Sequence, residues 1–317
     1  MVQELQIGGT SLRLMRAAPT ILCAGMAVLD EVFRVAAFPA PHAKTQADAF
    51  LTSVGGCAAN AAIAIARLGG RAELAAALGG PAEADEVGDR ILAGLAREGV
   101  AASGIVRVAG ATSTISTILV DAAGARTIVT HCDERLFACT PDDPAALVAG
   151  VDAVLADNWL PDLVVPICVE ARRRGIPVVL DGDGPMSDSD PLVTLASHLV
   201  FSAEGLRATI GDDDLAAGLR RIGARTQGFL AVTDGANDIL WRDGGTLRRL
   251  PVFAVAAIDT LAAGDVFHGA FALALAQGRG EVDALRFAAA TAAIKCTRFG
   301  GGAGAPNRAE VDAFLGT

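Results

Sequence analysis

The run Asp259–Asp265 has the residue types needed to bind an anion and to move a proton beside it. The apolar stretch Val266–Leu275 follows directly and predicts a buried helix. A helix start has backbone N–H groups without partners and a partial positive charge, and small side chains let a phosphate approach them. Asp265 lies at the mouth of this site, where its carboxylate would accept the proton of a nucleophile. The alternative is that Asp265 is only a helix N-cap and that the small residues serve packing.

A second motif has groups suited to sugar hydroxyls. Gly55 and Gly56 precede Asn60 in a Gly-Gly-x-x-x-Asn pattern that opens a predicted helix over residues 59–68. Glycines let backbone N–H groups approach a ligand, and the Asn60 amide is both a donor and an acceptor. Lys44, in a mixed β-like segment, could reach an anionic group of a substrate. The alternatives are a glycine turn with a solvated Asn60, and a solvated Lys44.

Polar side chains also follow predicted strands. Asp157 and Asn158 come after one apolar strand and could hydrogen-bond a substrate, with an Asx turn as an equal alternative. Asp181 and Asp183 come after the next strand, where a carboxylate pair could bind Mg²⁺ directly or through waters. Ligands of open α/β sheets bind beyond the carboxyl ends of the strands, so we expect these residues to face one crevice.

Alternating strands and helices must position these groups. The chain has 317 residues, of which 52% are hydrophobic, so it can bury a large core. From residue 151 onward, apolar strands alternate with helices, which predicts an α/β fold with a parallel sheet covered on both faces. Residues 21–29 predict the first strand, and residues 250–258 predict a strand that leads into the Asp259 turn.

Two earlier β segments, at about residues 31–54 and 110–132, do not fit this alternation and predict a small added sheet. Residues 1–20 have no clear period, so we expect them to be an N-terminal extension. The sequence of residues 21–317 contains no linker and no internal repeat, so these residues are expected to form one domain.

Composition excludes several classes of partner. The net charge is −10, there is no basic run and there is no tyrosine, which argues against binding of nucleic acid. No apolar run of about 18 residues predicts a membrane span. The six cysteines form no C-x-x-C pair and are interpreted as reduced thiols of a cytoplasmic protein. The four histidines are isolated, and His268 is expected to be a packed core residue rather than a catalyst.

The motif Asp259–Asp265 resembles the DTxGAGD signature of the PfkB family, the ribokinase-like carbohydrate kinases. The resemblance implies ATP-dependent phosphoryl transfer to a sugar hydroxyl. It makes Asp265 the catalytic base, and it makes the backbone amides of Ala262, Ala263 and Gly264 an anion hole for the transferred group. Ala262 stands where the first glycine is usual, and its methyl group could narrow the hole or demand a negative φ.

The resemblance extends over residues 21–317 with the order of motifs preserved. It implies a ribokinase-like three-layer α/β/α sandwich with a mainly parallel sheet, and it makes the two early β segments a lid over the sugar. Four residues match the sugar-binding first motif of the family: Asp30, Gly55, Gly56 and Asn60.

The nucleotide and metal sites follow from the same resemblance. The T-x-G-x-x-G nucleotide loop is matched by Thr233 and Gly235, and the further nucleotide-binding candidates are Ser202, Thr260, Arg298 and Gly302. Many family members carry N-x-x-E for Mg²⁺, but this chain has Ser202 and Gly205 at these positions. Glu204 or Asp183 would then replace the missing carboxylate, or ATP and water would hold the metal. The glycine-rich run after Lys295 matches a region that borders a monovalent cation (K⁺) in the family.

Several motifs, among them KCTRxGGxAGxP, are most similar to the sulfofructose kinase branch. We therefore expect a sugar kinase that acts on a primary hydroxyl of a ketohexose or a sulfofructose-like sugar. A nucleoside kinase of the adenosine type, a phosphofructokinase-like enzyme and a catalytically weak sugar or nucleotide sensor are the alternatives. An exposed lid edge would pair two chains into a homodimer.

Overall fold

A nine-stranded sheet runs through the middle of the protein in this computed structural model, which describes residues 4–7, 10–13, 17–81, 84–187 and 189–316. Its strands are β3 (Thr20–Ala24), β6 (Arg71–Gly80), β7 (Ala101–Ala109), β10 (Ala153–Asp157), β11 (Val178–Gly182), β12 (His198–Ser202), β13 (Phe229–Asp234), β14 (Asn237–Asp243) and β15 (Thr246–Leu250). The order across the sheet is β15-β14-β13-β12-β11-β10-β3-β6-β7. All neighbouring strands from β13 to β7 are parallel, and only β14 and β15 pair antiparallel.

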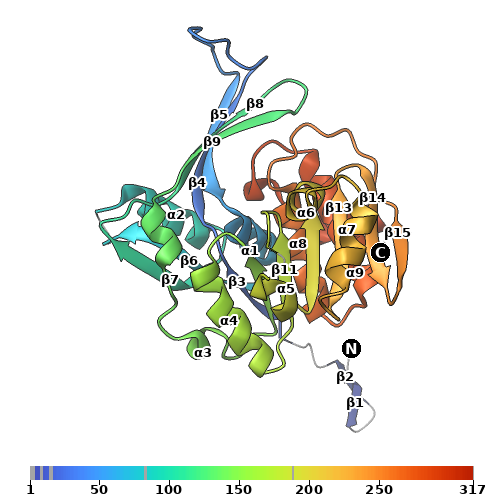
Figure 1. Cartoon of the computed structure of the whole chain (residues 1–317). Helices are drawn as coiled ribbons and strands as arrows, with labels where there is room; N and C mark the ends of the chain where they lie inside the picture. Colours follow the sequence, from blue (N-terminus) through green and yellow to red (C-terminus); the bar gives the residue numbers. More distant parts are fainter. Residues whose placement is uncertain (1–3, 8–9, 14–16, 82–83, 188, 317) are drawn as a thin grey trace.

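Helices cover both faces of this sheet, which confirms the three-layer α/β prediction (Figure 1). One face carries α1 (Cys57–Arg67), α2 (Glu86–Arg97), α8 (Ala263–Ala276), α9 (Glu281–Cys296) and α10 (Arg308–Leu315). The other carries α3 (Pro144–Leu147), α4 (Pro161–Arg173), α5 (Pro191–Leu195), α6 (Ala203–Ile210) and α7 (Leu215–Gly223). Successive strand residues enter opposite cores, as Ile21 and Leu22 do in β3, so the strands are apolar throughout.

A second sheet of four strands, here called the lid sheet after the prediction, projects from the body (Figure 1). Its strands, in the order β5-β4-β8-β9, are β4 (Val28–Arg34), β5 (Ala49–Gly55), β8 (Ile115–Val120) and β9 (Arg126–His131). The sequence prediction of a small added sheet is therefore confirmed. Two short 3₁₀ helices complete the elements near the site: η1 (Glu134–Ala138) and η2 (Gly302–Gly304).

The prediction of one strand over residues 21–29 is wrong. The chain leaves the main sheet after Ala24 and enters the lid sheet at Val28. Gly25 has φ 147°, and a Cβ there would lie 2.1 Å from a carboxylate oxygen of Asp157, so only glycine fits this bend. As a consequence, Asp30 lies within lid strand β4 and not at the end of a main-sheet strand.

The strand predicted over residues 250–258 is also wrong. The chain forms no strand between β15 and the Asp259 turn, and Ile258 is 54% exposed. Two backbone bonds hold this segment instead, because the N–H groups of Ile258 and Asp259 donate to the carbonyl of Cys296 at 2.9 and 3.2 Å. Apolar residues in an edge segment gave a strand-like pattern without a sheet partner.

In the N-terminal region, β1 (Glu4–Ile7) and β2 (Thr10–Arg13) pair only with each other. Residues 1–3, 8–9 and 14–16 of the expected extension lie outside the described residues. The assignment of residues 21–317 to one domain stays a prediction. Among the helices that the structure describes, none has both the length and the apolar character needed to cross a bilayer.

Candidate active site

The start of helix α8 is open to a ligand. The N–H of Ala263 donates to the carbonyl of Thr260 at 3.2 Å, whereas nothing in the described part of the chain accepts from the N–H of Ala262 or Gly264. Gly264 is exposed, and a Cβ built on it would meet no atom within 4 Å. Two of the three amides predicted for the anion hole therefore remain available at a helix N-terminus.

Ala262 adopts the left-handed conformation, with φ 60° and ψ 14°, so the expectation that its methyl group would demand a negative φ is wrong. An L-residue pays about 1–2 kcal/mol there, which glycine does not. The substitution Ala262→Gly is therefore expected to preserve turnover and to raise the free energy of unfolding by up to about 1 kcal/mol, since glycine is also more flexible when unfolded. Urea unfolding of both proteins measures this difference, and a clear loss of stability would contradict it.

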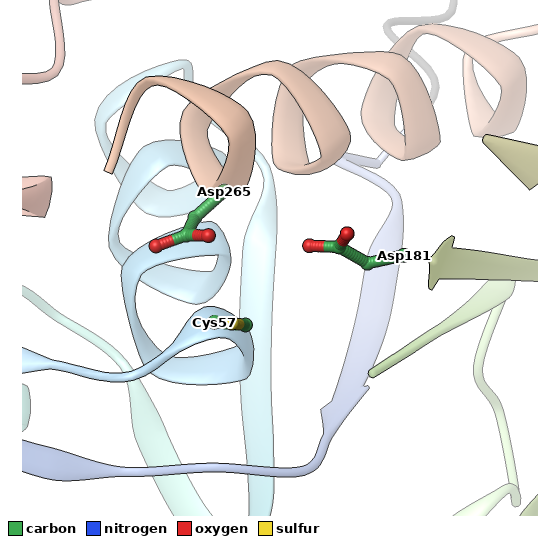
Figure 2. A group of neighbouring side chains, drawn as sticks. All are labelled: Cys57, Asp181 and Asp265. Atoms are coloured by element: carbon green, nitrogen blue, oxygen red, sulfur yellow. The ribbon is translucent and has the colours of Figure 1, made fainter. Parts of the chain in front are cut away.

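Asp265 lies in the first turn of α8 and faces Cys57 at the start of α1 and Asp181 at the end of β11 (Figure 2). One ligand-type atom of each of the three side chains lies within 4.8 Å of the others. Burial above all, with a contribution from the nearby acidic groups, raises the pKa of Asp265 to about 7, although the hydrogen bond from Asn60 works in the opposite direction. Burial and the neighbouring Asp265 also hold the pKa of Asp181 well above its ordinary value. Asp265 is therefore a half-buried acid whose pKa lies near neutral pH.

His268 is one turn further along α8 and is 2% exposed. Its Nδ1 lies 2.8 Å from the carbonyl oxygen of Gly264 and 3.2 Å from Asp181, and its Nε2 lies 3.1 Å from the carbonyl oxygen of Val200. Burial lowers the pKa of the ring, which favours the neutral form. The prediction of a packed, hydrogen-bonded core histidine is confirmed.

Asn60 connects the predicted base to the glycine-rich loop. Its side chain, 3% exposed, donates from Nδ2 to Oδ2 of Asp265 at 2.7 Å and accepts the N–H of Gly302 at Oδ1, at 3.0 Å. A Cβ on Gly302 would lie 2.5 Å from that oxygen, so the loop approaches Asn60 as closely as a glycine allows. Asn60, Asp265 and Gly302, which were predicted from separate motifs, are therefore in contact with one another through the Asn60 side chain.

Asp30 joins the same group from the lid sheet. It is 5% exposed, and a Cβ on Gly55 would lie 1.9 Å from its carboxylate. Burial and, to a smaller extent, the charge of Asp265 together raise the pKa of Asp30 to about 7. Gly56, with φ 90°, is the N-cap of α1 and packs against the carbonyl of Met26. Helix α1 therefore starts beside Asp265, the predicted base. The predicted sugar residues Asp30, Gly55, Gly56 and Asn60 therefore lie around Asp265.

Other predicted sugar residues have different surroundings. Asp157 is 1% exposed and accepts the N–H groups of Met26 and Trp159 at 2.7 and 3.1 Å, which is the Asx-turn alternative. Asn158 exchanges two hydrogen bonds with the backbone of Gly184, at 2.9 and 3.2 Å. Lys44 is exposed in the segment between β4 and β5. A role in substrate binding stays a prediction for all three.

Three of the nucleotide candidates, Ser202, Thr233 and Gly235, lie at the ends of β12 and β13. Ser202 and Thr233 are paired across the two strands, and Gly235 follows with φ 57°. Ser202 also caps α6 by accepting the N–H of Gly205 at 2.9 Å. A cavity of about 580 Å³ opens beside this loop and includes Asp234 and Asn237 in its lining. A role of these residues in nucleotide binding stays a prediction.

The departure from N-x-x-E has a steric explanation. A Cβ at position 205 would lie 2.0 Å from the carbonyl oxygen of Gly182 and 2.7 Å from that of Asp183, so a glutamate does not fit at this position. This contact places Asp183 next to the first turn of α6, where Glu204 lies, and both carboxylates are exposed. Two solvated carboxylates at one edge suit Mg²⁺, which keeps most of its waters.

Arg126, which sequence reasoning had not assigned, reaches the turn from lid strand β9. Its Nη1 donates to Oγ1 of Thr260 at 2.7 Å, so a lid residue touches the predicted phosphate turn. The only signal in the sequence was a basic residue at the end of a hairpin. Arg298, a predicted phosphate ligand, instead forms an ion pair with Glu310 at 2.5 Å.

Comparison with known proteins agrees with this geometry. Residues 18–308 match the family model described as pfkB family carbohydrate kinase. The ribokinase of Haemophilus influenzae is 28% identical over 309 residues, which are 95% of this chain and 99% of the relative. A crystal structure described as a "putative ribokinase" from Agrobacterium tumefaciens is 39% identical and has a TM-score of 0.89, with 94% of this chain and 98% of that chain covered. These matches confirm the fold prediction, but they do not confirm the sulfofructose kinase branch.

A more distant neighbour, the ribokinase of Arabidopsis thaliana complexed with ribose and ATP, is 22% identical with a TM-score of 0.79. It covers 95% of this chain and 100% of its own, and at this identity it supports the fold alone. The similarity therefore extends over the body and the lid, so the elements around Asp265 belong to the common architecture.

Proposed function

We propose that this chain, which belongs to the pfkB family of carbohydrate kinases, transfers the γ-phosphoryl group of ATP to a primary hydroxyl of a small sugar with Asp265 as the general base. Membership makes the chain an ATP-dependent sugar kinase. The observation that carries the specific proposal is the position of Asp265, a carboxylate with a raised pKa that directly follows Gly264 and its open N–H group at the start of α8.

In the proposed mechanism, Asp265 takes the proton of the attacking hydroxyl, and Asn60 fixes the direction of its carboxylate. The N–H groups of Ala262 and Gly264 then donate to the oxygens of the transferred group. Ala263 contributes less than expected, because its N–H already donates to Thr260. Arg126 supplies positive charge from the lid side of the same turn.

The nucleotide is proposed to bind along Ser202, Thr233 and Gly235, with its phosphates directed at the α8 start. Asp183 and Glu204 are the carboxylates that would hold Mg²⁺ through waters. Bound there, the ion neutralises phosphate charge. Thr260 keeps the Arg126 guanidinium beside the phosphates through its hydrogen bond.

For the acceptor we propose a ketohexose, with a sulfofructose-like sugar as the second candidate. Asp30 and Asn60 offer acceptors and a donor for neutral hydroxyls, whereas the acidic groups around Asp265 would repel an anionic sugar. A sulfonate would have to be held by Lys44 on the lid. A "probable fructokinase" of Arabidopsis thaliana and a fructokinase of Zea mays, both 27% identical over 85% and 84% of this chain, are consistent with a hexose.

A coupled assay of ADP production with fructose, ribose, sulfofructose and adenosine tests this proposal. A preference for fructose or sulfofructose supports it, and a preference for ribose replaces the acceptor without changing the mechanism. A preference for adenosine would make the chain a nucleoside kinase. Binding of sugar and nucleotide without turnover would make it a sensor and would contradict the proposed role of Asp265.

We also propose a homodimer formed through the lid sheet. Strand β9 is an edge strand with six exposed residues, including Val129 at 69% and Ile128 at 44%, and Phe50 on β5 is 55% exposed. Unpaired edge groups together with apolar side chains favour association with a second copy.

Accordingly, Val129→Asp is expected to convert the dimer into a monomer, because it puts two like charges into a symmetric interface. Light scattering after gel filtration gives the mass of each protein. Val169→Asp on α4 is the control, since Val169 is also exposed, at 50%, but lies away from the lid. A monomeric parent protein, or a dimer that survives the lid substitution, would exclude this interface.

A reducing, cytoplasmic location is proposed from the cysteines. All six are unpaired: Cys23, Cys57, Cys132, Cys139, Cys168 and Cys296. Free thiols persist where glutathione and thioredoxin keep them reduced, and ATP is supplied in the same compartment.

A further inference from the structure

Lys295, in the last turn of α9, is a fully buried cation beneath the predicted anion hole. Its side chain is 0% exposed, its Nζ donates to the backbone carbonyl of Asp259 at 3.0 Å, and the same atom lies 3.7 Å from Oδ2 of Asp259. A buried ammonium costs several kcal/mol unless it is paired. The chain contains only two lysines among its 26 basic residues, so a compact ammonium stands here in a chain that otherwise uses arginine.

Asp259 is the partner through which Lys295 acts. Its Oδ1 accepts the N–H of Leu261 and its Oδ2 accepts the N–H of Gly300, both at 2.8 Å. The first bond shapes the turn that presents the Ala262 amide, and the second holds the glycine-rich loop. The 1% exposed carboxylate therefore fixes both segments, and it needs a positive charge next to it.

We propose that the Lys295 ammonium takes the place of a monovalent cation in this enzyme, so that the anion hole is held in its active form without K⁺. This inference rests on the proposed function and corrects the expectation of a K⁺ site. The groups present do not fit K⁺, because the Asp259 carbonyl and carboxylate already face an ammonium that would repel a second cation. The Lys295 stem also fills the space under η2, where a Cβ on Gly304 would lie 3.4 Å from Cε.

Lys295 is thus a positioning residue. Its fully buried side chain is out of reach of a sugar or a nucleotide, so its effect would pass to the reaction through Asp259, Leu261 and Gly300. The arrangement places positive charge on both sides of the turn, with Lys295 below it and Arg126 on the lid side. A permanently attached cation has no binding equilibrium, so the turn keeps its shape at any K⁺ concentration.

The first experiment measures the wild-type enzyme with its best sugar in K⁺, Na⁺ and tetramethylammonium salts at constant ionic strength. The expected rates agree within about twofold, since no ion has to bind. Activation by K⁺ of tenfold or more would overturn the proposal. Absence of turnover with every sugar would count against the proposed function instead, and the second experiment then decides about Lys295.

The second experiment uses Lys295→Met, which keeps the apolar stem and removes the charge. Thermal unfolding of this variant in K⁺ against tetramethylammonium is expected to show a K⁺-dependent rise in Tm of several degrees that the wild type lacks, because K⁺ now neutralises Asp259. Its kcat is expected to fall about 10- to 100-fold with little change in KM for the sugar, and K⁺ should restore part of the rate. Arg220→Met, which removes one exposed charge from α7, should show neither effect.

Lys295→Met with unchanged kcat and Tm in both salts would overturn the role of the ammonium. If the variant fails to fold, Lys295→Arg, which keeps the charge, is measured in the same two salts instead. The bulkier guanidinium is expected to preserve K⁺ independence while lowering the rate, and a Lys295→Arg enzyme that requires K⁺ would contradict the proposal.

Discussion

Replacing Asp265 by asparagine is expected to cut kcat by a factor of about 10²–10⁴. The asparagine side chain has nearly the same shape, so the Asn60 contact and the α8 start can persist, but an amide cannot accept the proton of the attacking hydroxyl. Steady-state kinetics with saturating ATP and sugar measure the loss. Equilibrium binding of ADP is expected to remain within a few-fold of the wild-type value.

Stability provides the control for this variant. The folded-state pKa of Asp265 is raised from 3.8 to about 7, so the folded protein binds its proton more tightly than the unfolded chain does. Above pH 7 the charged carboxylate therefore destabilises the fold, and this penalty disappears below about pH 4. Asp265→Asn should be more stable than the wild type at pH 8 and equal to it at pH 4. Near-normal turnover in a folded variant would exclude Asp265 as the base.

The value of kcat/KM is expected to fall about tenfold for each pH unit below about 7, because Asp265 acts only after it has lost its proton. At pH 5 the loss would be about 100-fold relative to pH 8. Asp30, whose pKa is also raised to about 7, titrates in the same pH range beside Asp265. The acid limb of the profile, where kcat/KM falls, therefore reports the titration of both carboxyl groups together rather than of one residue. Initial rates at low sugar concentration between pH 5 and 9 give the profile.

The variant Asn60→Ala distinguishes titration of Asp265 from unspecific inactivation of the enzyme at low pH. The Asn60 amide donates to the charged form of Asp265, which lowers the pKa of the acid. Its removal should move the acid limb toward higher pH, in addition to reducing the rate at the plateau. A limb that stays in place, or a wild-type profile that is flat down to pH 5, would show that Asp265 does not control the reaction.

Much of the fold could be predicted because most of its elements have their own local pattern. Apolar strands that alternate with helices indicated the main sheet, and the two β segments at about residues 31–54 and 110–132 indicated the lid strands. The break after Ala24 escaped prediction, since the apolar run continues through the bend and Gly25 is required by a contact with Asp157, far away in the sequence. Strand β7 was missed because its small and polar residues, only one of them fully buried, give no clear alternation.

The site was predictable where a motif keeps its residues together. Asp265, Asn60 and the glycines came from short runs, and the structure places them around one point. Arg126 and Lys295 are single residues in otherwise ordinary elements. Their importance depends on contacts with Thr260 and Asp259, which are made only when the lid and α9 reach the same turn.

The Asn60 contacts have a consequence for how activity appears during refolding. They join residues separated by 205 and 242 positions in the sequence, so they belong to the most distant contacts of the chain. Such contacts form late, after the local strand–helix units. A refolding intermediate with a complete sheet would therefore show native circular dichroism and no turnover, and recovery of the rate would mark the docking of the last loop.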